Sequence, residues 1–225
     1  MGIDNREAAA IVLDLETAPI VGVESYLEPQ TAPANYKDAE KIAAYINDAT
    51  AKAAHMAGLD PDLARIVALG WMHEGRDIVP QVLTCADEHE ERIALTRLWA
   101  DVVLTNRAVR RLVTFNGHGF DLPVLMRRSL YLDVPYPRLN IDRYRSPHAD
   151  LMQMLSFHGA IKPHGLQFYA KRFELLEGIE DDTTGRQIAA LVAAADWPAI
   201  RAHCAADVLL TYRLAVRMGP MEVGT

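Results

Sequence analysis

Hydrophobic residues in the first part of the chain alternate between strand-like runs and turn signals. Residues 10–17 form a compact apolar run with β-branched side chains, which predicts a buried strand. Residues 65–72 and 77–84 have the same character and predict a hairpin, with a glycine among the joining residues 73–76. Pro80 indicates a sheet edge or a bulge within the second of these strands.

Two longer segments repeat their apolar residues at helical spacing. The first runs from about Lys37 to Met56, after a proline-rich stretch, and residues 20–60 are interpreted as an insertion in the sheet. The second runs from about Glu88 to Val103. We expect it to turn four apolar side chains inward, namely Ile93, Leu95, Leu98 and Val102.

The remaining pattern completes a mixed fold. A strand at 111–115 leads through a glycine-containing turn to a helix from about Leu122 to Leu130, and no strong strand pattern follows residue 150. The later helical patterns lie at 165–174, 185–194 and 196–217. We therefore expect the α/β class, with a mixed β-sheet flanked by α-helices and a helical C-terminal part. Residues 1–225 are expected to form a single domain.

The composition and the net charge of the chain argue against some classes of protein. Half of the 225 residues are hydrophobic and 24% are charged, as in ordinary folded proteins. The net charge of −7 argues against a broad basic face that grips long duplex nucleic acid. A site that binds divalent cations can still attract a phosphate locally. Because no segment resembles a signal peptide or a membrane span, we expect a cytoplasmic protein with no membrane partner.

Asp14 and Glu16 are the first candidates for chemistry. They are two residues apart on a predicted strand, so their side chains share one face, roughly 6.6 Å apart along the backbone. Two carboxylates on an otherwise apolar strand repel each other, and a divalent cation between them would reverse the sign of that interaction. The alternative is that the strand ends at Leu13 and leaves both acids in a solvated loop.

Two further segments supply matching acids. Asp121 follows Asn116-Gly-His-Gly-Phe120 at a strand-to-helix junction, where glycines let the backbone approach a ligand. Its alternative role is to cap the following helix. His203 and Asp207 are four residues apart on a predicted helix and therefore share a face. Their alternative role is an exposed ion pair.

These three segments together resemble a known family. They occur in order as Asp14-Leu-Glu-Thr17, Asn116-Gly-His-Gly-Phe-Asp-Leu-Pro123 and His203-Cys-Ala-Ala-Asp-Val-Leu-Leu-Thr211. In this order they resemble the motifs of the DEDD 3′–5′ exonucleases of the RNase H-like (DnaQ-like) superfamily. Within it the chain is most similar to the proofreading exonuclease domain of family-B DNA polymerases, as a stand-alone domain. The resemblance spans residues 10 to about 217.

The resemblance implies an activity and a set of ligands. It implies an RNase H-like sheet and a metal-dependent exonuclease that releases nucleotides from the 3′ end of nucleic acid, with single-stranded DNA preferred. Two divalent ions, Mg²⁺ or Mn²⁺, would be held by Asp14, Glu16, Asp121 and Asp207. The terminal nucleotide would contact the backbone near Leu15 and Thr17, the Asn116 side chain and the Phe120 ring.

One position departs from the family pattern. The superfamily has one branch with His five residues before the last Asp and another with Tyr four residues before it, whereas His203 stands four residues before Asp207. We interpret His203 as the catalytic residue that orients water and acts as general base, which predicts that activity falls below about pH 6.5. Two alternative functions remain: an exoribonuclease of the same superfamily and a catalytically silent nucleic-acid-binding domain. A replication or repair protein is a further possible partner.

Overall fold

The computed structural model describes residues 10–73, 77, 79–104, 112–142 and 144–218. These residues form a five-stranded sheet in the order β3-β2-β1-β4-β5. The strands are β1 (Ile11–Pro19), β2 (Ala64–His73), β3 (Gln81–Thr84), β4 (Leu112–Thr114) and β5 (Ala149–Asp150). β3, β2 and β1 pair antiparallel, while β1, β4 and β5 pair parallel. The mixed sheet expected from the sequence is confirmed.

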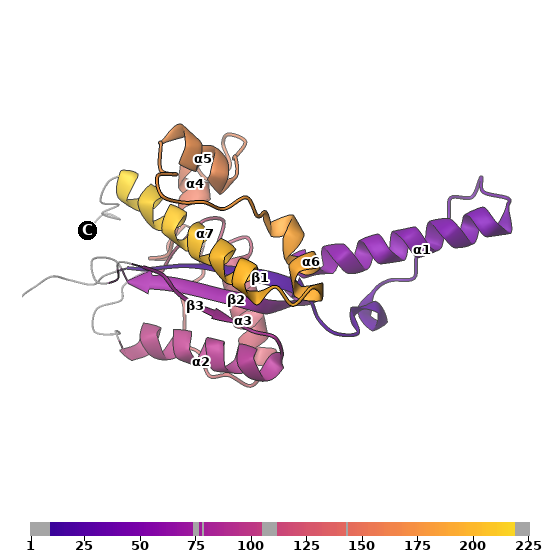
Figure 1. Cartoon of the computed structure of the whole chain (residues 1–225), viewed down its shortest axis with the longest axis horizontal. Coiled ribbons are helices and arrows are strands. Elements are labelled where there is room, and N and C mark those ends of the chain that lie inside the picture. The colour runs from indigo at the N-terminus through magenta and orange to yellow at the C-terminus, as the bar shows by residue number, and fades with distance from the viewer. Residues whose placement is uncertain (1–9, 74–76, 78, 105–111, 143, 219–225) are drawn as a thin grey trace, which may run out of the picture.

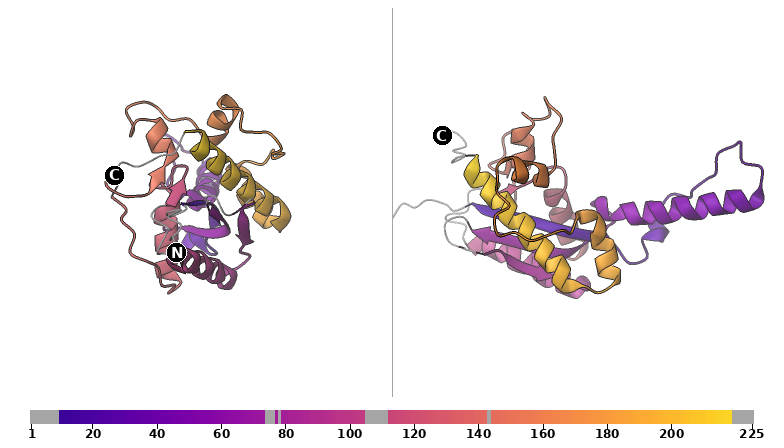
Figure 2. Two further views of the ribbon diagram at one scale, coloured as in Figure 1. Left: turned by 90° about the vertical axis from the view of Figure 1, so that its left-hand side faces the viewer. Right: turned by 45° about the horizontal axis from the view of Figure 1, so that its top comes forward.

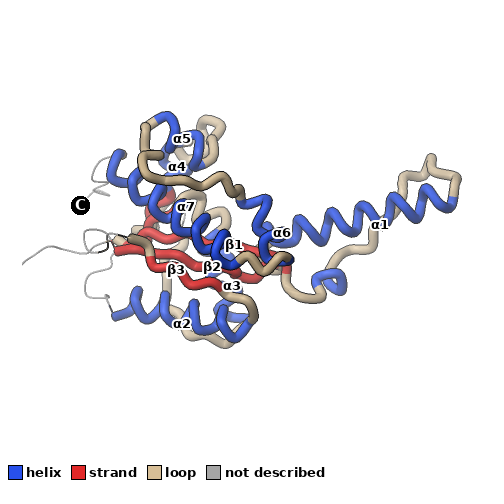
Figure 3. Tube along the Cα trace, in the orientation of Figure 1, coloured by secondary structure: helices blue, strands red, loops and turns tan. Residues whose placement is uncertain are grey.

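Helices cover both faces of this sheet. They are α1 (Ala39–Met56), α2 (Glu88–Leu104), α3 (Asp121–Tyr131), α4 (Leu151–Leu155), α5 (Leu166–Arg172), α6 (Ile188–Ala193) and α7 (Trp197–Arg217), with short 3-10 helices η1 (Val23–Tyr26), η2 (Ala57–Leu59) and η3 (Gly185–Gln187). Figure 1 shows α7 crossing one face of the sheet and α2 lying against the other, and Figure 3 separates helices from strands by colour. The helical C-terminal part is confirmed as well.

Two layers of hydrophobic side chains hold the helices to the sheet. On one face Leu13 of β1 packs with Leu95 and Leu98 of α2. On the other face Val12 packs with Leu210 of α7. Successive side chains of a strand point to opposite faces, so β1 contributes to both layers and is the central structural element of the molecule.

The segment between β1 and β2 extends away from the sheet. Asp38 caps α1, because its side chain accepts hydrogen bonds from the backbone N–H groups of Glu40 and Lys41, and the helix therefore begins at Ala39 rather than at Lys37. No residue of α1 is buried. Figures 1 and 2 show the helix projecting from the body.

Three expectations about local structure were wrong or incomplete. The strand predicted at 77–84 begins only at Gln81, because the Asp77 carboxylate accepts the His73 backbone N–H and Pro80 has none to donate. Ile93, predicted to face inward, is 45% exposed, whereas Ala94 of the next helical position is buried. The two-residue strand β5 had no sequence signal of its own.

Among the residues that the structure describes, no helix combines the length and the apolar character needed to cross a membrane.

Candidate active site

Asp14 and Glu16 lie on the face of β1 that α7 covers. Val12 packs in the layer beneath α7, while Leu13 and Leu15 pack toward α2 and α3. The alternation of side chains therefore turns Asp14 and Glu16 toward α7, and the two share one face, as expected from their spacing. The strand continues through both residues to Pro19, so neither lies in a solvated loop. The register of β1 on β2 shifts directly after Glu16.

The N-terminal half of α7 brings His203 and Asp207 to this face. Gly70 of β2 pairs with Asp14, and the side chains of Cys204 and Val208 on α7 come close because Gly70 has no side chain. The His203 Nε2 atom lies 3.6 Å from Glu16 Oε1 and 4.0 Å from Asp207 Oδ2. His203 is buried, so the two residues do not form the exposed ion pair that the sequence left open.

The turn that precedes Asp121 is held by hydrogen bonds to the Asp150 carboxylate. Asn116 has a positive φ of 69°, and Gly117 is required because a Cβ there would lie 1.9 Å from Thr114 Oγ1. The Asp150 carboxylate accepts the backbone N–H groups of Asn116 and His118, each at 3.0 Å. The chain then enters α3 with Asp121 as its first residue.

Asp121 is not the helix cap that the sequence allowed as an alternative. Phe120 occupies the capping position and makes no side-chain capping bond. Asp121 is buried, and burial raises its pKa to about 7. Asp150 and Asp207 add to this rise by like-charge repulsion, whereas the hydrogen bond from the Asp121 backbone opposes it. A buried carboxyl with this pKa is typical of a functional site.

The four carboxylates repel one another inside the protein. Burial is the main cause that raises the pKa of Asp14, and the charges of Asp121, Glu16 and Asp207 raise it further. Burial also raises the pKa of Glu16 and of Asp207, although His203 opposes the rise at Asp207. Within the described ranges, no Lys or Arg forms an ion pair with any of the four. The cluster therefore has an excess of negative charge.

This donor set fits a divalent cation. Glu16, His203 and Asp207 each offer one ligand atom, and these atoms lie within 4.8 Å of one another. The carboxylate oxygens suit hard cations such as Mg²⁺ or Mn²⁺ better than a thiolate-binding metal. A bound cation would also relieve the repulsion that raises the carboxylate pKa values.

Sequence reasoning missed one residue of this cluster. Asp181, in the loop between α5 and η3, has its Oδ2 atom 2.7 Å from His203 Nδ1. It lies in the acidic run Glu180-Asp181-Asp182, which has the composition of an ordinary solvated loop. Only the tertiary fold brings this loop to α7, since the two residues are 22 positions apart.

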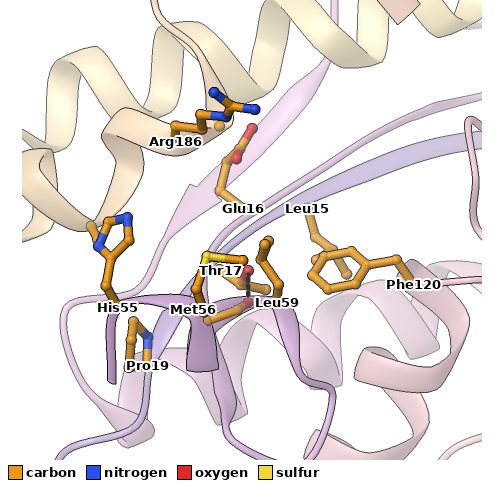
Figure 4. A pocket seen from close by; sticks show the side chains of 12 residues that line it. Leu15, Glu16, Thr17, Pro19, His55, Met56, Leu59, Phe120 and Arg186 are labelled. Carbon is orange, nitrogen blue, oxygen red and sulfur yellow. Dashed lines mark hydrogen bonds between the residues drawn. The ribbon is translucent and has the colours of Figure 1, made fainter. Parts of the chain in front are cut away.

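A cavity of about 510 Å³ adjoins Glu16. Figure 4 shows the Phe120 ring on one side and the Arg186 guanidinium on the other, near the Glu16 carboxylate. The lining residues come from β1, the end of α1, η2, the residue before α3, η3 and α6: Leu15, Glu16, Thr17, Pro19, His55, Met56, Gly58, Leu59, Phe120, Gly185, Arg186 and Ala189. Leu15, Thr17 and Phe120 were sequence candidates, whereas Asn116 does not line this cavity. No sequence signal singled out His55, Met56 or Arg186.

The sequence of this chain matches one known protein family. Residues 59–224 match a family described as predicted 3′–5′ exonuclease related to the exonuclease domain of PolB. The matched residues include Asp121, His203 and Asp207 but begin after Asp14 and Glu16. A comparison with curated protein sequences gives no significant match.

A solved structure has the same fold. The family B DNA polymerase from the hyperthermophilic archaeon Pyrobaculum calidifontis aligns over 94% of this chain, with a TM-score of 0.61 and 18% sequence identity. The alignment covers 24% of the polymerase, so this chain spans about a quarter of its length.

Proposed function

Because this chain belongs to the family of predicted 3′–5′ exonucleases related to the exonuclease domain of PolB, we propose that it removes nucleotides one at a time from the 3′ end of single-stranded DNA. One observation carries the proposal. Three distant segments supply Asp14, Glu16, Asp121 and Asp207, and burial, reinforced by neighbouring negative charges, raises the pKa of each. We also propose that the whole chain acts as one exonuclease domain, with residues 20–60 as an insertion.

The acidic residues have a specific role in this proposal. The carboxylates of Asp14, Glu16, Asp121 and Asp207 would hold two divalent cations, Mg²⁺ or Mn²⁺, which when bound stabilise the negative charge on the attacking and leaving oxygens. Among the residues that the structure describes, no Lys or Arg pairs with these carboxylates, which supports this role.

His203 accepts a proton in the proposed hydrolysis. Its Nε2 atom faces Glu16 and Asp207 but lies outside hydrogen-bond distance of both, at 3.6 Å and 4.0 Å. The attacking water gives one proton to Nε2 while its oxygen forms a bond to phosphorus. The bond from phosphorus to the 3′ oxygen breaks, and that oxygen takes a proton from solvent. The products are a nucleoside 5′-monophosphate and a strand shorter by one nucleotide.

The adjoining cavity would receive the terminal nucleotide. Its volume of about 510 Å³ lies within the usual range for small-molecule sites. The Phe120 ring offers a surface on which a base can stack, and stacking of this kind contributes about 1–3 kcal/mol. Arg186 supplies a cation on the opposite wall, beside an otherwise acidic centre. The net charge of −7 favours a single-stranded end over a long duplex.

The test uses 5′-labelled single-stranded DNA and RNA of one sequence, together with a covalently closed circle of the same DNA. We expect linear DNA to shorten from its 3′ end in single-nucleotide steps with Mg²⁺ or Mn²⁺, while the circle stays intact. EDTA, or the Asp14→Ala/Glu16→Ala variant, should abolish the ladder. Faster loss of RNA would instead identify an exoribonuclease. No degradation of any strand would favour a silent binding domain.

A further inference from the structure

The Asp181 carboxylate is held by a hydrogen bond at each oxygen. Oδ2 lies 2.7 Å from His203 Nδ1, and Oδ1 accepts the backbone N–H of Thr183 at 3.1 Å. The side chains of Asp181 and His203 are only 7% and 4% exposed. A short contact between two nearly buried side chains, with the carboxylate anchored to its own loop, limits the rotation of the imidazole ring.

This contact determines which ring nitrogen faces the acidic centre. A carboxylate oxygen accepts hydrogen bonds, so the proton of a neutral His203 ring belongs on Nδ1. The Nε2 atom then carries the lone pair and faces Glu16 Oε1 and Asp207 Oδ2. A ring rotated by 180°, or a proton on Nε2, would leave no lone pair directed at the position that the attacking water would occupy.

We propose that Asp181 is a positioning residue, which fixes the His203 ring with Nδ1–H toward the loop between α5 and η3 and with the Nε2 lone pair toward Glu16 and Asp207. The proposal deepens the exonuclease function and rests on it for its consequence in catalysis. It concerns the orientation and tautomer of the ring, and these are properties of the protein before any nucleic acid binds. Carboxylate partners of functional histidines act in this way in many sites.

The first test measures the tautomer directly, in EDTA and without substrate. The ¹⁵N-labelled protein is studied by long-range ¹H–¹⁵N correlation at about pH 8.5, where a free imidazole is neutral. The His203 ring, one of eight histidines, is assigned by its loss in His203→Ala. We expect the Nδ1–H tautomer in the native chain and in Asp182→Asn, which changes the adjacent exposed carboxylate. Asp181→Ala should give a mixture or the Nε2–H form.

The second test asks whether Asp181 acts through His203. We expect Asp181→Ala to lower kcat by about 10–100-fold with little change in KM, as for other partners of site histidines. Asp182→Asn should stay within about twofold of the native chain, as surface substitutions usually do. In a His203→Ala background, Asp181→Ala should cause no further loss, because the residue it positions is already absent.

The outcomes separate the two proposals. A native chain with the Nε2–H tautomer, or an Asp181→Ala chain with an unchanged tautomer, would overturn the positioning role even if the enzyme is active. An equal loss of kcat with and without His203 would overturn it too. A native chain that degrades nothing yet holds the Nδ1–H tautomer, lost in Asp181→Ala, would contradict the exonuclease function and leave the positioning role supported. If Asp181→Ala melts too early to be studied, the native tautomer decides the question.

Discussion

Gly70 of β2 and Val208 of α7 are so close that a Cβ added to Gly70 would lie 2.8 Å from Val208 Cγ2. The same Cβ would lie 2.9 Å from the Cys204 sulfur, which in turn lies 3.8 Å from the carbonyl oxygen of Asp14. Because Gly70 is also the β-ladder partner of Asp14, this contact sets the distance between the helix that carries Asp207 and the strand that carries Asp14. The geometry of the site thus depends on the packing of α7 against the sheet.

We therefore predict that Gly70→Ala destabilises the protein by about 1–3 kcal/mol, the usual cost of overpacking a core. Cleavage should slow as well, since α7 must shift away from β1. Urea denaturation measures the first effect. Gly165→Ala is the matched control, because its added Cβ meets no atom within 4 Å. Val208→Ala in the Gly70→Ala background should recover part of the stability. Unchanged stability in Gly70→Ala would contradict this account of the packing.

Arg128 and Glu91 form a buried ion pair that joins α3 to α2. The Arg128 Nε and Nη2 atoms lie 2.7 Å and 2.8 Å from the two Glu91 carboxylate oxygens, and Glu91 Oε1 also accepts the backbone N–H of Ile66. The side chains are 4% and 0% exposed. Arg128→Ala leaves a buried carboxylate without its cation, so we predict a loss of about 3–5 kcal/mol in urea denaturation.

The adjacent arginine is the control for that prediction. Arg127 pairs with Asp62 at the surface, where the side chains are 45% and 46% exposed. Exposed pairs contribute about 0–1 kcal/mol, so Arg127→Ala should cost no more than this. An equal loss of unfolding free energy in the two variants would show that the buried pair between α2 and α3 stabilises the protein no more than the surface pair does.

Asp121 gives the metal-free protein a dependence on pH. Its pKa of about 7 lies above the value of 3.8 for a free carboxyl, so the folded state binds this proton more tightly than the unfolded chain. The contribution of the proton to stability is therefore complete below about pH 4 and is lost as the pH rises to about 7. In EDTA the melting temperature should fall more steeply across this window in the native chain than in Asp121→Asn. Parallel melting curves would argue against the burial of an ionisable Asp121.

Arg186 should affect substrate binding more than chemistry. Its guanidinium lines the cavity beside Glu16, on an exposed 3-10 helix, where a phosphate of the bound strand would lie. We predict that Arg186→Ala raises KM for single-stranded DNA and weakens its dependence on salt concentration, while kcat changes little. Arg186→Lys should keep part of the effect, since it retains the charge. A fall in kcat at unchanged KM would contradict a binding role.

Local patterns in the sequence were enough to predict most elements and to predict which candidate side chains share a face. A spacing of two on a strand placed Asp14 and Glu16 on one face, and a spacing of four on a helix placed His203 beside Asp207. Such relationships depend only on the periodicity of a single element. The mixed sheet followed from the order of strand-like and helix-like runs.

Contacts between segments that are distant in the sequence could not be predicted from local patterns. Asp181 reaches His203 from a loop whose acidic run resembles solvated surface, and Glu91 of α2 is buried and paired with Arg128 of another helix. Arg127 and Arg128 are adjacent in sequence, yet one is half-exposed and the other buried. The inward face of α2 was misjudged at Ile93 because the helix turns toward both the sheet and α3. Tertiary packing determines which of these side chains are buried and which residues they contact.

The most direct test of the central claim is single-turnover cleavage of 5′-labelled single-stranded DNA, started by adding Mg²⁺ to EDTA-treated protein. The native chain and Asp182→Asn should shorten the strand from its 3′ end one nucleotide at a time. Asp207→Asn should be slower by about 100-fold or more, which corresponds to a barrier raised by about 2.7 kcal/mol. Shortening at the same rate in Asp207→Asn, or no shortening by the native chain, would contradict the assignment of these carboxylates to a metal-dependent exonuclease.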